Sequence, residues 1–266
     1  MPFGAPFRGL VTANAPLWAG EAEVFRTYWD WPERNRESDL CWLARQCHKE
    51  FWGGGYAKRR GLFAAPLEDM SAAFEKIDRG VSRHRVLAMA AQLYQEFSHY
   101  CAFADAYDAI KTETDAGLDP WRLKDGSWPE NDELSKLRAR HREQYGEIGR
   151  RAHKLTEGGY CGLFREGMAL KGRSAADDAI AAACTKVHAD EFGHMLAGIA
   201  DIAHEPLSAD DWVVLSDLTT AQMRQRIHMR NAQFGYPLSE ARILEILAGE
   251  IEPISFDYEQ AARFLA

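Results

Sequence analysis

The most informative pattern in the chain is an apolar helical stripe with two polar residues at its centre. Positions 180, 184, 187, 191, 194, 198 and 202 are three or four residues apart, so they share one face of a helix. That face is apolar except at Glu191 and His194. A buried carboxylate without a partner is costly. The pair therefore indicates either two core residues bonded to each other or a metal site.

A second stripe repeats this arrangement. Glu96 and His99 lie at the centre of a mostly apolar face formed by positions 89, 92, 96, 99, 103, 106 and 110. Three residues apart on a helix, a carboxylate and an imidazole project side by side and can bind one metal ion. One such pair is a weak signal, whereas two pairs on two long helices favour a metal site built between helices.

Helical periodicity extends over most of the chain, and no segment shows the alternation typical of a strand. Capping boxes start at Ser174 and Ser208, and the proline- and glycine-containing segment 117–131 is the clearest loop. The expected helices cover residues 21–28, 38–52, 66–79, 82–116, 132–171, 174–205, 208–234, 237–249 and 257–265. We therefore expect an all-α protein.

The length of the chain fits a single domain over residues 1–266. Within it we expect an N-terminal extension (1–61), an antiparallel four-helix bundle (62–205) that holds the metals, and additional C-terminal helices (206–266).

Composition narrows the function classes. The net charge is −8 without a basic block, which argues against nucleic acid as a partner. No apolar run reaches signal-peptide or membrane-spanning length, and the five cysteines contain no Cys-x-x-Cys pair. We expect reduced thiols, a cytoplasmic location and no membrane contact.

The remaining ligands can be located by counting residues from the turns. Two residues at the same level of an antiparallel helix pair are about equally far along the chain from the turn that joins the helices. Glu157 and Glu191 are similarly distant from the turn near Arg173. The same count from the turn near Gly80 pairs Glu96 with Glu68 and leaves two alternatives, Asp69 and Glu50.

The predicted metal ligands are then two imidazoles and four carboxylates: Glu68, Glu96, His99, Glu157, Glu191 and His194. Clustered carboxylates need counter-charge, and two divalent cations supply it. The ligand types suit two iron ions, or a manganese and an iron ion.

At this point the chain resembles the ferritin-like di-iron carboxylate superfamily. The run Asp190-Glu-Phe-Gly-His194 is similar to the Asp-Glu-x-x-His of bacterial di-iron monooxygenases and of the ribonucleotide reductase small subunit. The resemblance implies a ferritin-like bundle in which Asp190 bonds the ligand His99 and fixes its tautomer.

The chain also departs from these families. Phe103 stands where the reductase carries its radical tyrosine, and Cys161 stands where the monooxygenases carry threonine. The related arylamine N-oxygenases use an extra histidine ligand, so His188 and His153 are candidates either for that role or for supporting the ligands.

Several glycines fall inside predicted helices near the ligands. Gly158, Gly159, Gly162 and Gly193 leave three explanations open: space for a substrate, a local π-bulge, or close packing of helices. The apolar wall of such a substrate space is predicted to comprise Phe103, Tyr160, Cys161, Phe164, Phe192 and Met195.

The resemblance implies an oxidoreductase that activates O₂, its co-substrate, to oxidise a small organic molecule. Hydroxylation, desaturation, N-oxygenation and oxidative cleavage all stay open, as does a homodimer. An electron donor or reductase is the expected partner. The main alternative is a ferroxidase that handles iron. A haem-oxygenase-like di-iron oxidase and a metal-free structural bundle are weaker alternatives.

Overall fold

The computed structural model describes residues 3–52, 64–156, 161–203 and 207–264. Within these ranges the chain is helical with no strand, which confirms the expected all-α class. The helices are α1 (Ala5–Trp29), α2 (Arg36–Trp52), α3 (Ala64–Phe74), α4 (Arg83–Ile110), the 3₁₀ turn η1 (Leu123–Asp125), α5 (Pro129–Thr156), α6 (Gly162–Met168), α7 (Ala175–Ala203), α8 (Ala209–Gln233), α9 (Glu240–Leu247) and α10 (Tyr258–Phe264). Among them, none is both long and apolar enough to cross a membrane.

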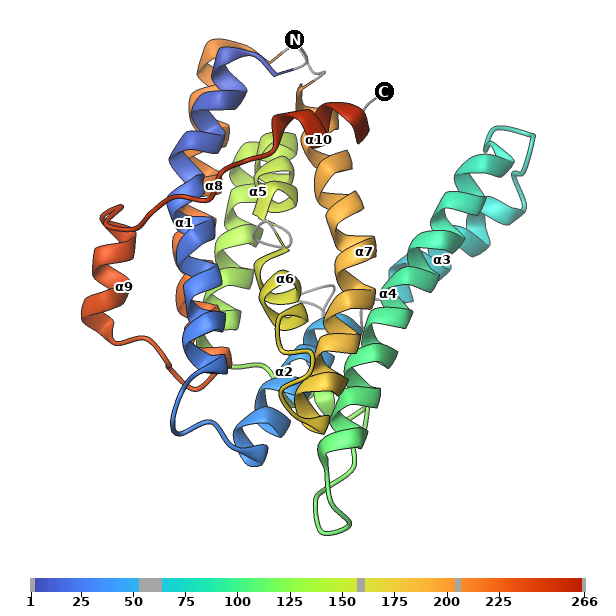
Figure 1. Ribbon diagram of the computed structural model, residues 1–266. Helices are drawn as coiled ribbons and strands as arrows, with labels where there is room; N and C mark the ends of the chain where they lie inside the picture. Colours follow the sequence, from blue (N-terminus) through green and yellow to red (C-terminus); the bar gives the residue numbers. More distant parts are fainter. Residues whose placement is uncertain (1–2, 53–63, 157–160, 204–206, 265–266) are drawn as a thin grey trace.

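The helices pack as a connected series of neighbours. Helix α2 packs on α4, α4 on α7, and α7 on α6, while α1 contacts α6 and α8, and α8 contacts α5 (Figure 1). Helices α2, α4 and α7 therefore lie side by side, and this places their polar residues in one region. Helices α1 and α8 lie outside the predicted bundle range yet contribute to the main apolar core.

Helix α1 differs from the sequence expectation. The predicted extension with one short helix is instead a helix of 25 residues, with Pro6 in its first turn and Pro16 inside it. An internal proline costs about 3 kcal/mol. Burial of large side chains such as Trp18, Phe25 and Tyr28 stabilises by about 1.5–3 kcal/mol each and outweighs that cost. The first segment is thus part of the core.

The expected continuous helix over 132–171 is also wrong. Gly146 has φ 54° and ψ −119° inside α5, a conformation that favours glycine. Arg138 donates to the Thr156 hydroxyl over 2.8 Å. A straight helix would separate these residues by roughly 27 Å, so the chain must reverse direction at Gly146. As a result α5 packs mainly on α8, and the short α6 lies along α7.

Helix α3 and the first half of α4 extend away from the body as a two-helix arm (Figure 1). Helix α3 packs on α4. Ser82 caps α4 by accepting a hydrogen bond from the His84 backbone N–H. The rest of α4 returns to the body, where Phe103 and Ala106 are buried.

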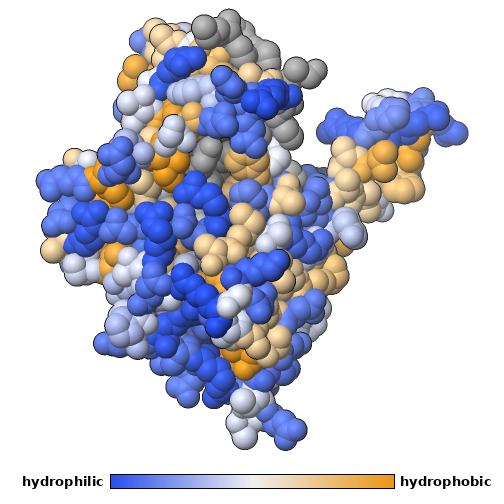
Figure 2. All heavy atoms as spheres, in the orientation of Figure 1, coloured by the Kyte–Doolittle hydropathy of each residue, from blue (hydrophilic) through white to orange (hydrophobic). Residues whose placement is uncertain are grey.

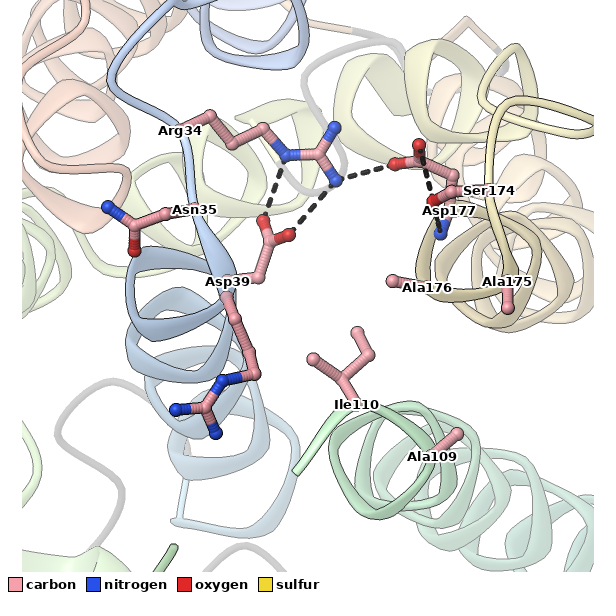
Figure 3. Close-up of a pocket in the computed structure, with 10 residues that line it drawn as sticks. Arg34, Asn35, Asp39, Ala109, Ile110, Ser174, Ala175, Ala176 and Asp177 are labelled. Carbon is pink, nitrogen blue, oxygen red and sulfur yellow. Dashed lines mark hydrogen bonds and ion pairs between the residues drawn. The ribbon is translucent and has the colours of Figure 1, made fainter. Parts of the chain in front are cut away.

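The start of α7 is fixed to the segment between α1 and α2. The predicted cap is present, because the Ser174 hydroxyl accepts from the Asp177 backbone N–H. Arg34 bonds Asp39 through two nitrogens and Asp177 at 2.6 Å, beside a surface pocket of about 440 Å³ that Ile110 also lines (Figure 3). The guanidinium bonds two carboxylates from different helices, so this contact is a structural clamp.

Two glycines of α6 mark close helix contacts. A Cβ on Gly167 would overlap the Cys184 sulfur of α7, whereas a Cβ on Gly162 would lie 3.5 Å from the Phe25 ring of α1. At Gly162 an added Cβ would make ordinary contact with α1, so α1 rather than open substrate space lies beside this glycine. Gly158 and Gly159 lie outside the described residues.

These contacts predict opposite outcomes for one substitution. Gly167→Ala should lower the free energy of unfolding by about 1–3 kcal/mol because it overpacks the α6–α7 contact. Gly162→Ala should change it little, or stabilise by up to about 1 kcal/mol through better helix propensity. Urea denaturation of both variants measures the difference. Equal destabilisation would contradict the close contact with Cys184.

Candidate metal centre

The buried imidazole of His99 is the centre of the candidate site. His99 Nε2 lies 3.2 Å from Asp190 Oδ2, so the predicted contact between these residues is present. His99 Nδ1 lies 3.4 Å from Glu191 Oε1 and 3.9 Å from Glu96 Oε2. The neighbouring helices α4 and α7 thus bring the Glu96–His99 pair close to Asp190 and Glu191.

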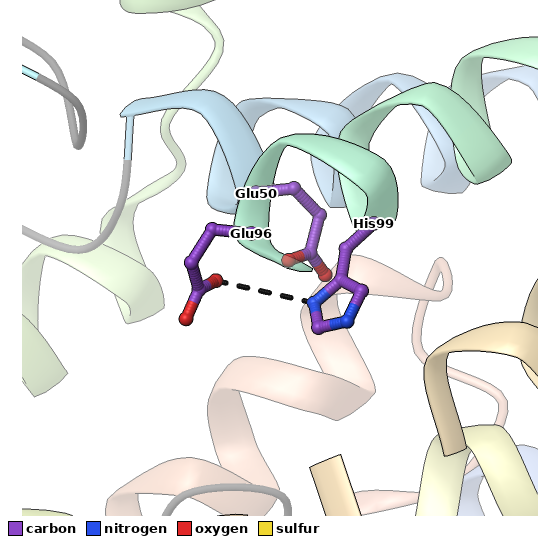
Figure 4. Close-up of side chains that lie close together, drawn as sticks. All are labelled: Glu50, Glu96 and His99. Carbon is purple, nitrogen blue, oxygen red and sulfur yellow. Dashed lines mark ion pairs between the residues drawn. The ribbon is translucent and has the colours of Figure 1, made fainter. Parts of the chain in front are cut away.

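A third carboxylate comes from α2. Ligand atoms of Glu50, Glu96 and His99 all lie within 4.8 Å of one another, a spacing that can hold a metal ion (Figure 4). Glu50 is buried, and its Oε1 accepts a hydrogen bond from the Gln46 side chain one turn earlier on α2. The side chains of Glu96, Asp190 and Glu191 are partly exposed, so solvent reaches the cluster.

The electrostatics of this cluster fit a bound cation. When the neutral imidazole of His99 carries its proton on Nε2 and donates it as a hydrogen bond to Asp190, the lone pair on Nδ1 points toward carboxylate oxygens. Among the described residues, Nδ1 has no hydrogen-bond partner. Burial, and secondarily the charge of Glu191, raises the pKa of Glu50, although His99 and Gln46 act in the opposite direction. A metal ion would satisfy both the lone pair and the carboxylates.

The structure distributes the predicted ligands unevenly. It brings Glu96, His99 and Glu191 together, but Glu68 lies exposed on α3 with Asp69 beside it. Glu50, kept as an alternative from the sequence, occupies the place predicted for Glu68. The count from the turn near Gly80 assumed that α3 is the bundle neighbour of α4 at this level, whereas the neighbour is α2.

Two other predicted ligands cannot be placed. Glu157 lies outside the described residues. His194 belongs to α7, but the position of its side chain is not among those described. Both stay predictions.

A buried polar network lies behind Glu50. Gln46 accepts hydrogen bonds from Arg230 and Gln233 of α8 through its Oε1. Arg230 also donates to the fully buried Glu21 of α1. Arg226 donates to both Glu21 oxygens, and the two guanidiniums lower the pKa of that carboxyl against the effect of burial. The network connects Glu50 to α1 and α8 and holds its carboxylate in one orientation.

The sequence pattern does not predict this network, because it indicates only an N-terminal extension for residues 1–61. The signal was present: Glu21 stands among the aromatic residues Trp18, Phe25 and Tyr28 at helical spacing.

The two additional histidines occupy different surroundings. Desolvation first, and then nearby basic groups led by Arg138, lowers the pKa of His153 to about 2. His188 stacks on Phe192 with 5.5 Å between ring centroids, and desolvation lowers its pKa too. Within the described part of the chain, neither joins the cluster around His99.

The low pKa of His153 predicts a pH dependence of stability. Below about pH 6.5 the unfolded chain binds a proton at this histidine that the folded chain does not, so stability falls as the pH decreases toward 2. In His153→Gln that contribution is absent. The slope of the unfolding free energy against pH should therefore be smaller in His153→Gln than in the parent protein, by up to ~1.4 kcal/mol per pH unit, which corresponds to one proton. Urea denaturation with a chelator between pH 7 and 5 measures it, and identical slopes would contradict the buried neutral imidazole.

Three of the six residues of the predicted substrate wall, Phe103, Cys161 and Phe164, are buried in the core. Phe103 is fully buried against Trp42 and Phe164, with ring centroids 6.3 and 6.1 Å away. Cys161 is also buried, and burial followed by the charge of Glu191 raises the pKa of its thiol. Tyr160 lies outside the described residues, as does the side chain of Met195.

Comparisons with family models, curated proteins and solved structures find no match for this chain. The interpretation of the site therefore depends on its geometry and on the two Glu-x-x-His pairs.

Proposed function

We propose that this protein is an O₂-activating non-haem di-iron oxidase of ferritin-like architecture that acts on a small organic molecule. The observation that carries the proposal is the convergence of Glu50, Glu96, Glu191 and His99 from three helices. Its donor set of carboxylates and imidazole suits iron, with a manganese–iron pair as the alternative. His194 and Glu157 complete the proposed ligand set.

The residues have distinct tasks in this proposal. Bound iron supplies the redox chemistry toward O₂. Asp190 accepts a hydrogen bond from the Nε2–H of His99 and so keeps the Nδ1 lone pair directed at the cluster. Gln46 donates to Glu50 and orients it, backed by Arg230. The partly exposed side, at Glu96 and Asp190, gives ions and reactants access.

Anaerobic titration with Fe(II) tests the proposal. The metal-free protein should bind about two ions per chain and gain thermal stability, because an ion that binds only the folded state stabilises it. Admission of O₂ should then oxidise the bound iron within seconds and produce a transient visible absorption. A protein that binds no iron, and whose melting temperature does not respond to Fe(II), would refute the proposal.

A ferroxidase is the second candidate. It is favoured because Phe103 and Phe164, which were expected to line a substrate space, pack against each other in the core, and a ferroxidase needs no space for an organic substrate. Repeated additions of Fe(II) and O₂ separate the two functions. A ferroxidase keeps oxidising and retaining iron well beyond two ions per chain. An oxidase stops at the bound ions until an external reductant and a substrate are supplied.

A further inference from the structure

The two-helix arm, residues 64–97, carries a concentration of exposed apolar side chains. Of the ten large apolar side chains that are exposed in the described ranges, five lie on the arm: Leu67, Phe74, Leu87, Tyr94 and Phe97. Leu87 is 66% exposed and Tyr94 is 72% exposed. Figure 2 shows the stem of the arm as an apolar surface that stands clear of the body. Clustered exposed apolar side chains of this kind mark interaction surfaces.

The arm also lacks internal support. Helix α3 packs on α4 and makes no comparable contact with any other of the described helices. It has 11 residues, and isolated helices of that length are marginal in water. Two helices bury only the seam between them, whereas a four-helix bundle encloses an apolar core. A second helix pair would therefore complete the packing of this one.

The distribution of charge along the arm indicates which helix pair could pack against it. The tip, residues 75–85, has four Lys or Arg residues against two acids. The stem, residues 64–74 and 86–97, has Glu68, Asp69 and Glu96 and no Lys or Arg. Two arms laid antiparallel would place each basic tip near the acidic stem of the other. The arm is thus complementary to itself, as a two-fold symmetric interface requires.

We propose that the arm docks against the arm of a second copy of this chain, so that α3 and α4 of both copies form an antiparallel four-helix contact. The apolar faces supply the buried area, and the opposite charges set the antiparallel direction. Glu96 belongs both to the stem and to the cluster around His99, whereas the residues altered below, Asp69, Arg85 and Leu87, are not part of that cluster, so the dimer is tested separately from the metal chemistry.

Sedimentation of the full chain tests the proposal. The parent protein should sediment as a dimer, twice the 30.0 kDa of one chain, at micromolar concentration. Leu87→Glu should be monomeric, with a dissociation constant at least about 100-fold higher, because symmetry places the altered side chain in the contact twice. Val213→Glu on α8 is the matched control: Val213 is 61% exposed, and its replacement should leave the dimer intact.

Three results would overturn the proposal. The first is a monomeric parent chain at every concentration up to about 100 µM. The second is a dimer that Leu87→Glu does not weaken while circular dichroism shows a folded variant. The third is a monomer that sediments with phosphatidylglycerol–phosphatidylcholine vesicles through the same leucine, which would assign the arm to a membrane surface.

Charge reversal tests the antiparallel direction. Arg85→Glu in the tip and Asp69→Lys in the stem should each raise the dissociation constant of the homodimer by about 5–10-fold at low salt. An equimolar mixture of the two variants should regain the parental affinity, because each altered end then meets an opposite charge. Failure of the mixture to recover would reject the antiparallel pairing.

Discussion

Glu21→Gln will unfold far more easily than the parent protein, with a loss of about 3–5 kcal/mol in the free energy of unfolding. The substitution removes the one carboxylate that Arg226 and Arg230 share, and all three side chains are buried. Two buried guanidiniums would lose the carboxylate that both of them bond in the core between α1 and α8. Denaturation with urea, followed by circular dichroism, measures the loss.

The same helix offers the control. Glu23 lies two residues further along α1 and pairs with Arg242, but both side chains are partly exposed. Glu23→Gln should cost no more than about 1 kcal/mol, because solvent screens this pair. If the two variants were equally stable, Glu21 would not be the anchor of a buried network.

Glu50→Ala will bind less iron than the parent, about one ion per chain or fewer in place of about two. Glu50 is the buried carboxylate that lies with Glu96 and His99. Glu191→Ala should lose iron similarly, since Glu191 Oε1 lies 3.4 Å from the His99 ring. Metal analysis by mass spectrometry after anaerobic loading and desalting provides the measurement.

Glu68→Ala is the matched control for Glu50→Ala. The side chain of Glu68 is exposed on the arm, so its removal should leave about two ions bound. Circular dichroism must show that each variant is folded. Loss of iron in Glu68→Ala with full binding in Glu50→Ala would restore the ligand assignment made by counting along the chain.

The local part of the site could be predicted from sequence because helical periodicity fixes which residues share a face. Glu96 and His99 on α4, and Glu191 on α7, needed no tertiary information to be singled out. The contact between Asp190 and His99 followed from the resemblance to the di-iron families. The capping signals at Ser174 and Ser208 likewise depend on residues three apart. Ser208 forms the full capping box, and the Ser174 hydroxyl accepts a hydrogen bond from the Asp177 backbone N–H.

The helix partners could not be predicted in the same way. Counting from turns assumes straight helices and sequential neighbours, and both assumptions fail here. The chain reverses at Gly146, so α5 packs mainly on α8, and α3 extends with α4 into the arm. The position counted for Glu68 is consequently taken by Glu50 from the preceding helix.

The sequence alone determined the all-α class, the positions of the two Glu-x-x-His pairs and the acidic character of the chain, since each depends on local spacing or on composition. Tertiary structure decided that Glu50 is the carboxylate that joins His99, and that Glu21 on α1 supports Glu50 through Arg230 and Gln46. These are contacts between residues far apart in the chain, such as Glu21 with Arg226. They depend on how helices of similar apolar character choose their neighbours, and periodicity within a helix carries no information about that choice.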